Sequence, residues 1–212
     1  MNRLQLRSMR LIEVLAALAF LVIATVTVFA IAPGIVPGAS GSAGDWTQTE
    51  SGPLGPADRD FLVKVRQAGL WEIPTGQQAQ ERAGSERVKE VGRHLIADHT
   101  KLDEQVRALA AKLNVPLPST PNADQQGWMA ELSARTGEEY DRAFADRLRF
   151  AHGKVFAVVA AVRAGTKNDE IRAFAQVAVD VVMKHMTLLE STGKVDFAAL
   201  PTPPPPSPNP SK

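Results

Sequence analysis

The sequence predicts an all-α protein in which an N-terminal apolar segment precedes an antiparallel four-helix bundle. Apolar residues recur at spacings of three and four over long stretches between residues 58 and 196, which is the periodicity of a helix with one buried face. Breaks rich in proline or glycine separate the stretches, and no alternating strand pattern competes. Short connections after the first and third helices favour antiparallel neighbours.

The first 32 residues are predicted to be a membrane anchor or signal segment. Arginines precede an apolar run from Val14 to Ala32 that contains no charged residue. A membrane-spanning helix needs about 20 apolar residues, whereas the core of a cleaved signal has about 7–15. The length of the run, and Pro33 directly after a possible cleavage site, favour a retained anchor. Because basic flanks stay in the cytoplasm, we expect an extracytoplasmic domain at the cell membrane, or a secreted one if the segment is cleaved.

The remaining chain divides by composition into a linker, a folded part and a tail. Residues 33–57 are rich in Gly, Ser and Pro and predict a flexible linker. Residues 58–196 carry the four-helix bundle. Residues 197–212 include the run PTPPPPSPNPSK and predict a disordered, extended tail. The tail either has no role of its own or contacts the cell wall or a proline-binding partner.

Composition limits the possible functions. The 212 residues are 44% hydrophobic, enough for one packed core, and the net charge of +1 argues against a nucleic-acid partner. The chain contains no cysteine, which excludes disulfides, thiolate metal ligands and a cysteine nucleophile. No phosphate-binding loop, nucleophile elbow or catalytic triad can be recognised in the sequence, so the pattern favours a protein that is not an enzyme.

The first two helices are predicted from Asp58, as an N-cap, and from Ser85. Pro74 should kink the first. The inward stripe of the first helix is predicted to contain Phe61, Val65, Ala68, Glu72, Ala79 and Ala83. The stripe of the second is predicted to contain Val88, Val91, Leu95, His99, Leu102, Val106, Leu109 and Leu113.

The third and fourth helices follow a connection that ends near residue 122. The third begins near Asp124, is loosened at Gly127 and Gly137, and closes at Gly165. Its inward stripe is predicted to contain Phe144, Leu148, His152, Val155, Val159 and Val162. The fourth stops at Gly193 and should turn Ile171, Phe174, Ala178, Val182, His185 and Leu189 inward.

Each predicted helix places a possible metal ligand on its buried face. The candidates are Glu72, His99, Asp141, His152 and His185. Counting from the turns at about 1.5 Å per residue puts Glu72, His99 and His152 in one layer, with His185 about a turn away and Asp141 further. Imidazole and carboxylate ligands suit Zn, Cu, Fe or Mn.

Other interpretations of these residues remain open. Each can be a hydrogen-bonded core residue, and Glu72 and His99 can form a buried pair without a metal. No histidine has a glutamate three residues before it, so the di-iron ferroxidase pattern is disfavoured. His94 is expected to pair with Asp98 on the flank of the second helix; the alternative is that the two residues support a metal ligand from behind. The cofactor is therefore unknown, with Fe, Mn, Zn, Cu or none as the alternatives.

Several motifs between residues 60 and 196 resemble a known family. They are LWEIPTGQQAQERA, HLIADHTKLDEQVRALAAKLNVPLP, EEYDRAFADRLRFAHGKV, VRAGTKNDEIRAFA and KHMTLLESTGKVD. They are similar to the domain-of-unknown-function 4142 family, which implies a ferritin-like fold in a secreted or membrane-attached protein. The resemblance places the family's recurrent polar positions on Glu72, Asp98, His99, Asp141, His152 and His185. It implies no activity, since the family is named for its unknown function.

Two functional hypotheses follow. The first is a membrane-tethered or secreted helical module that binds a cell-envelope or protein partner and performs no chemistry. The second is a ferritin-like protein that binds a metal or cofactor, with redox chemistry as one option, through the inward Glu and His residues. Metal content and the phenotype of His99 and His152 variants distinguish the two hypotheses.

Overall fold

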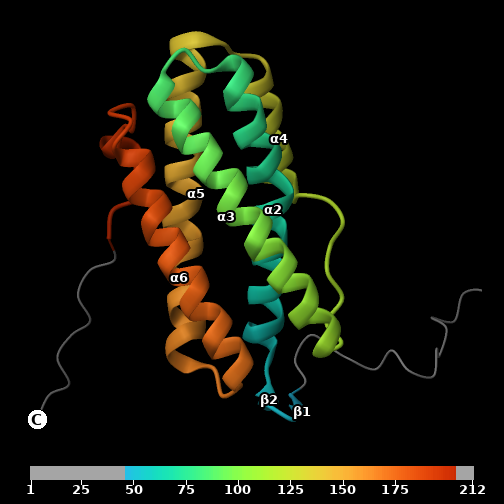
Figure 1. Ribbon diagram of the computed structural model, residues 1–212. Coiled ribbons are helices and arrows are strands. Elements are labelled where there is room, and N and C mark those ends of the chain that lie inside the picture. Colours follow the sequence, from blue (N-terminus) through green and yellow to red (C-terminus); the bar gives the residue numbers. More distant parts are fainter. Residues whose placement is uncertain (1–45, 204–212) are drawn as a thin grey trace, which may run out of the picture. The chain divides into compact units, whose positions relative to one another are not determined.

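The computed structural model describes residues 46–203 (Figure 1). The predicted membrane segment, the first part of the linker and the end of the tail lie outside these residues. Within residues 46–203, no helix combines the length and the apolar character that crossing a membrane requires.

Helices make up most of the described part, as the all-α prediction requires. The elements in chain order are β1 (Thr47–Thr49), β2 (Gly52–Leu54), α2 (Pro56–Arg82), α3 (Glu86–Lys112), α4 (Ala123–Ser133), α5 (Gly137–Gly165), α6 (Asp169–Glu190) and the short 3₁₀ helix η1 (Phe197–Ala199). The all-α class is therefore confirmed, with one small hairpin added.

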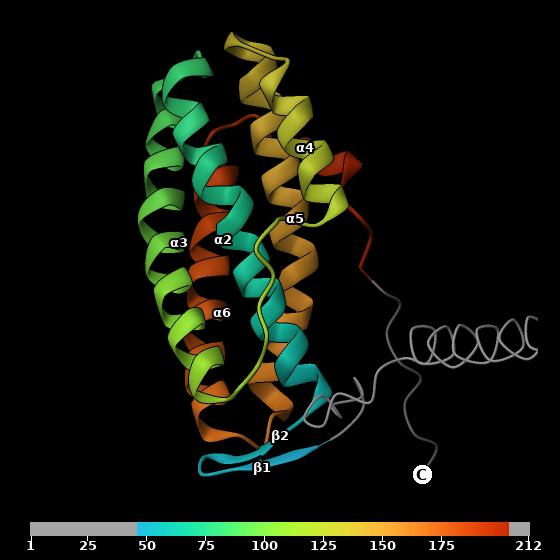
Figure 2. The same cartoon turned by 90° about the vertical axis from the view of Figure 1, so that its right-hand side faces the viewer.

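The four long helices α2, α3, α5 and α6 pack side by side, and both views show them surrounding a common interior (Figures 1 and 2). The most extensive contacts join α2 to α3 and α5 to α6, and each pair is connected by a short turn. Contacts of α3 with α6 and of α2 with α5 close the group. Helix α4 lies outside, against α2 and α5 (Figure 2).

The buried apolar side chains form two separate clusters. The first cluster contains Leu54, Phe61, Leu62, Val65, Leu102, Val106, Ala110, Leu113, Val115, Val159, Val162, Ile171, Phe174, Ala175 and Ala178. The second contains Trp71, Ala79, Ala83, Val88, Val91, Leu95, Leu132, Tyr140, Phe144, Leu148 and Leu189. On α3, α5 and α6, the buried residues His99, His152 and His185 lie between the two clusters, and on α2 the buried Glu72 directly follows Trp71, where the second cluster begins. A polar layer thus divides the core.

The third predicted helix is two helices in the structure. Helix α4 ends at Ser133, and α5 begins at Gly137, whose φ of +60° is a left-handed conformation that glycine adopts without strain. The predicted loosening at Gly137 is therefore a full break. Gly127, in contrast, lies inside α4.

The first long helix begins earlier than predicted because its cap is different. The N-cap is Gly55, with Pro56 in the first turn, and Asp58 occupies the third helical position. The Asp58 carboxylate accepts a hydrogen bond of 2.7 Å from the backbone N–H of Gly55. This bond is one half of a capping box, because glycine has no side chain to accept a bond in return, and it satisfies one amide at the helix start. Helix α2 also continues through Pro74 to Arg82.

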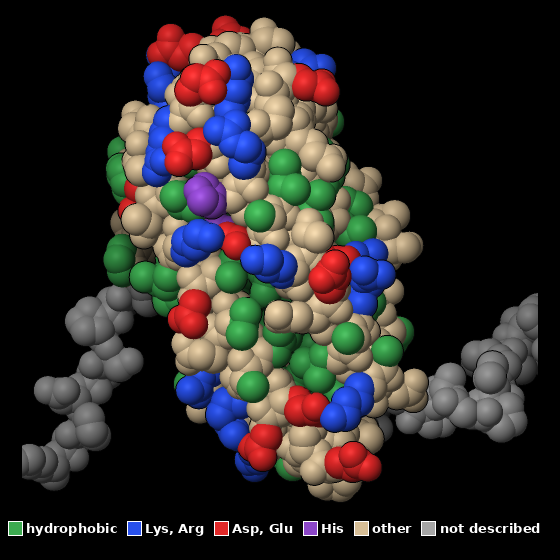
Figure 3. All heavy atoms as spheres, in the orientation of Figure 1, with side chains coloured by type: hydrophobic (Ala, Val, Ile, Leu, Met, Phe, Trp, Pro, Cys, Tyr) green, Lys and Arg blue, Asp and Glu red, His purple; other side chains and the backbone are tan. Residues whose placement is uncertain are grey.

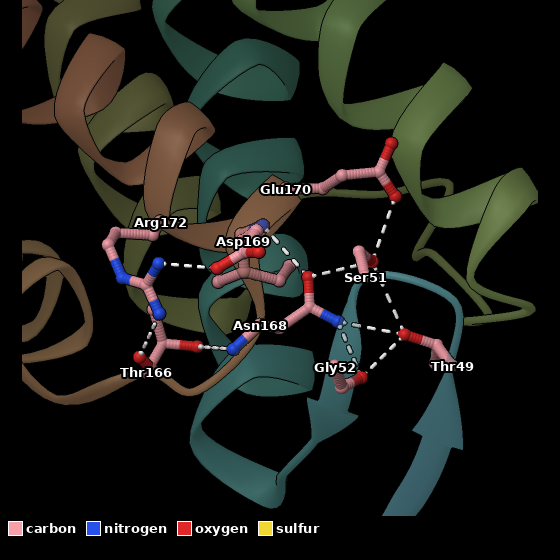
Figure 4. A network of polar contacts seen from close by, with 9 residues as sticks. Thr49, Ser51, Gly52, Thr166, Asn168, Asp169, Glu170 and Arg172 are labelled. Carbon is pink, nitrogen blue, oxygen red and sulfur yellow. Dashed lines mark hydrogen bonds and ion pairs between the residues drawn. The ribbon is translucent and has the colours of Figure 1, made fainter.

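Part of the predicted flexible linker forms an antiparallel hairpin, in which Thr47 pairs with Leu54 and Thr49 with Gly52. The hairpin is held against the turn before α6 (Figure 4). The side-chain amide of Asn168, which is fully buried, donates to Thr49 Oγ1 and to the Gly52 carbonyl, both at 3.0 Å. The Gly/Ser/Pro composition does not indicate this contact because its partner lies more than a hundred residues away.

Candidate metal centre

The polar layer of the core is built by one side chain from each long helix. Glu72 comes from α2, His99 from α3, His152 from α5 and His185 from α6, and none of these residues is more than 4% exposed. One ligand atom from each lies within 4.8 Å of the other three. Three of the chain's four histidines thus meet one carboxylate.

The spacing of these atoms is close to that of a coordination shell. Glu72 Oε2 lies 2.8 Å from His99 Nε2 and 3.4 Å from His152 Nε2. His152 Nε2 lies 3.1 Å from His185 Nδ1. In a tetrahedral site with metal–ligand bonds of about 2.1 Å, the ligand atoms are about 3.4 Å apart. The four side chains therefore need only small movements to bind one ion.

A backbone carbonyl fixes the tautomer of His152. Its Nδ1 lies 2.8 Å from the carbonyl oxygen of Leu148. That oxygen can only accept a hydrogen bond, so Nδ1 carries the proton and donates it. In the neutral ring, the lone pair is then on Nε2, the atom that faces Glu72 and His185.

A carboxylate fixes the tautomer of His185. Its Nε2 lies 3.0 Å from Asp98 Oδ2, which also accepts a hydrogen bond of 2.6 Å from Lys184 Nζ. Burial alone would raise the pKa of Asp98, but the hydrogen bonds from Lys184 and His185 lower it overall. Asp98 is therefore an anionic acceptor, His185 Nε2 donates, and the lone pair of His185 is on Nδ1. Carboxylates orient metal-binding histidines in this way.

Two unprotonated nitrogens consequently face each other. With both rings neutral, His152 Nε2 and His185 Nδ1 present lone pairs to one another at 3.1 Å and share no proton. Protonating either ring is unfavourable: burial lowers the pKa of His152, and burial together with the neighbouring His152 and His99 lowers that of His185 to about 3. A cation between the two nitrogens would remove the repulsion.

The carboxylate of the layer supplies a negative charge. Burial alone would raise the pKa of Glu72, but His152, His99 and His185 lower it from 4.5 to about 2 when they carry positive charge. With those rings neutral, a bound cation would take their place in keeping Glu72 ionised. Among residues 46–203, Glu72 Oε2 and both ring nitrogens of His99 are buried without an aligned hydrogen-bond partner, although the two side chains approach to 2.8 Å. Buried polar atoms are normally satisfied, and a bound ion is one explanation for exceptions.

Beside these groups lies a cavity of about 20 Å³, lined by Glu72, His99 and His152 and, from the apolar side, by Val65, Ala68, Leu102, Val155, Val159, Ala178 and Val182. A sphere of water size needs roughly 10–15 Å³. The cavity therefore has room for one small particle next to the converging atoms, and its apolar wall excludes bulk solvent.

Two of the sequence predictions need correction. Asp141 is buried but lies apart from the four ligands, where its Oδ1 accepts a hydrogen bond of 3.1 Å from the backbone N–H of Gly84 in the α2–α3 turn. Its role there is to satisfy an amide of the turn. His185, expected about a turn away, shares the layer of the other three, because counting from a turn ignores how α6 is shifted along α5.

The predicted pairing of His94 with Asp98 is also wrong. Asp98 binds Lys184 and His185 across to α6. Periodicity missed its role because Asp98 is next to the inward stripe and not on it. The only local sign of this role in the sequence is that Asp98 directly precedes His99. Nothing in the sequence indicates that the Leu148 carbonyl orients His152.

Comparison with known families matches residues 44–191 to a family model described as a domain of unknown function (DUF4142). The chain belongs to this family. The match includes all four members of the polar layer, Asp98 and the hairpin. No curated protein and no solved structure matches the chain. The chemistry of this DUF4142 protein has therefore to be argued from its own geometry.

Proposed function

We propose that this protein binds a single transition-metal ion through Glu72, His99, His152 and His185, in a ferritin-like four-helix bundle that the N-terminal segment exports and tethers to the membrane. One observation carries the proposal. Two neutral imidazoles with fixed tautomers point their lone pairs at each other, beside a buried carboxylate and a third imidazole.

The types of ligand limit which metal ions the site can bind. Three imidazoles and one carboxylate suit Zn²⁺, Fe²⁺, Mn²⁺ or Cu²⁺, whereas Ca²⁺ and Mg²⁺ prefer oxygen ligands alone. Four protein ligands in a buried layer form a closed set, which is typical of structural or storage sites; catalytic zinc sites keep one position open. We therefore favour metal holding over hydrolysis.

The location rests on the sequence. The arginines and the apolar run from Val14 to Ala32 support an anchor with the folded domain outside the cytoplasm. Acidic and basic side chains are interspersed over the face drawn in Figure 3, and the net charge is +1. Neither feature favours a polyanionic partner.

A second candidate is the module that binds an envelope partner without a metal. The approach of 2.8 Å between Glu72 and His99 favours it, because the two side chains can form a buried pair without a metal. In that case, the polar layer would only shape the core, and function would lie on the surface.

Metal analysis of the full chain, purified in detergent without a histidine tag or chelator, tests both candidates. We expect about one equivalent of metal per chain, lost in His99→Gln and His152→Gln. His94→Gln is the matched control, since His94 is the one histidine outside the layer. Absence of metal from all samples, with no thermal shift on adding Zn²⁺, Fe²⁺, Mn²⁺ or Cu²⁺, would favour the metal-free module.

A further inference from the structure

A groove on the surface leads toward the polar layer. It is lined by residues of α2, α4 and α5, the helices that lie next to one another in Figure 2, and has a volume of about 240 Å³. Its lining includes Glu72 from α2, Gln125 and Trp128 from α4, and Lys154 from α5. Drug-sized ligands occupy about 300–1,000 Å³, so this groove suits a smaller molecule.

The groove and the buried cavity share part of their walls. Ala68, Glu72 and Val155 line both. Glu72 is a ligand of the proposed metal, and the other two side chains are small or medium-sized. A molecule seated in the groove would therefore lie next to the Glu72 side of the metal centre.

The floor of the groove suits a flat apolar body. The half-buried Trp128 ring packs on the Trp71 ring beneath it, with 5.3 Å between centroids and an inclination of 56°; Trp71 itself is only 1% exposed. Ala151 and Val158 add short apolar side chains. Indoles bind planar groups by stacking or edge-to-face contact, which adds to the stabilisation from burial.

The polar groups of the groove favour an acid. Gln125 is 8% exposed; its Oε1 accepts from the Asn122 N–H at 2.9 Å, and its side-chain nitrogen has no partner among residues 46–203. Lys154 is exposed and, within the same residues, pairs with no carboxylate, lying 5.3 Å from the Phe150 ring centroid. Both groups can donate to an anionic oxygen.

Two further charged side chains at the mouth of the groove indicate how many negative charges the ligand carries. Lys64 is already bound by both carboxylate oxygens of Asp60, so it offers little to a ligand. Asp124 is exposed in the first turn of α4, where the helix dipole favours its negative charge. It would oppose an anion at that end, so a single carboxylate fits better than a polyanion.

We propose that the groove binds a small planar organic acid, with its carboxylate held by Lys154 and Gln125 and its apolar body against Trp128, Ala151 and Val158. The acid would lie beside Glu72 and so couple to metal occupancy; this second part rests on the proposed metal site.

Benzoate is the test probe, and benzamide, which has the same shape without the charge, is the matched control. Binding to the metal-free full chain is followed by tryptophan fluorescence in a Trp46→Phe background, because Trp46 lies outside the groove. We expect saturable benzoate binding that exceeds benzamide binding. Lys154→Gln should weaken it about three- to fivefold and Asp124→Asn should strengthen it about twofold, as exposed charges do. Lys101→Gln, at an exposed position on α3, should have no effect, and Ala151→Leu should block the groove.

No saturable binding, or equal binding of benzoate and benzamide that Lys154→Gln leaves unchanged, would overturn the proposal. The titration is repeated with Zn²⁺ bound, where benzoate should bind more tightly and should equally tighten Zn²⁺ binding. Benzoate affinity that is the same with and without bound Zn²⁺ would overturn the coupling. If the proposed metal site is wrong, elemental analysis will show it. The benzoate titration of the metal-free protein tests the groove independently of that result.

Discussion

Asp98 is predicted to control metal affinity without touching the metal. Replacing it with alanine removes the acceptor for the Nε2–H of His185, and the ring is then free to turn or to exchange tautomer. Loss of such an orienting carboxylate weakens metal binding about 10–100-fold, which is about 1.4–2.7 kcal/mol. Asp98→Asn should lose less than tenfold, because its amide oxygen can still accept the same hydrogen bond.

Competition with a fluorescent chelator measures the affinity of the full chain for Zn²⁺, and ¹⁵N spectra of the metal-free histidine rings report the tautomers. The spectra should show the proton on Nδ1 of His152 and on Nε2 of His185. Asp180→Ala is the control, because Asp180 is an exposed acid on the same helix as His185. A folded Asp98→Ala variant with unchanged Zn²⁺ affinity would refute the tautomer argument and remove His185 from the ligand set.

Three further predictions concern stability. The pKa of His185 is lowered from 6.5 to about 3 by burial and its neighbouring imidazoles, so the unfolded state binds more protons between those values. The free energy of unfolding of the metal-free protein should therefore be independent of this group above about pH 6.5 and should fall by up to about 1.4 kcal/mol per pH unit between pH 6.5 and pH 3. Urea unfolding in EDTA at pH 7 and pH 5 measures this fall, which should be smaller in His185→Gln than in the unmodified protein. Gly76→Ala should destabilise the protein by about 1–3 kcal/mol, because the new Cβ would lie 2.6 Å from the Gly92 carbonyl oxygen. Gly127→Ala has open space around it and should stabilise the protein by about 0.5–1 kcal/mol. If thermal unfolding shows equal effects for the two variants, the close approach of α2 and α3 is contradicted. Asn168→Ala should release the β1–β2 hairpin. The rate of hydrogen exchange of the hairpin amides should then rise while that of the α3 amides stays unchanged. If the hairpin amides remain protected, the hydrogen bonds of Asn168 do not hold the hairpin.

Much of the fold could be predicted because its determinants are local. The periodicity of apolar residues reports which face of each helix is buried, and it identified the stripes that carry Glu72, His99, His152 and His185. Glycine at residue 137 signalled an interruption, although its extent depended on the positive φ that the turn adopts. The hairpin at residues 47–54 escaped prediction because its stability comes from Asn168, which is distant in sequence.

The sequence by itself determined the all-α class, the family and the polar residues on inward faces, since these follow from side-chain chemistry repeated along one helix. Only the tertiary structure decided which of those residues meet. It set Asp141 at the α2–α3 turn, moved His185 into the layer and gave Asp98 its role behind that histidine. The physical reason is that the shift of one helix along another depends on side-chain packing between elements, and spacing within a single helix carries no information about it.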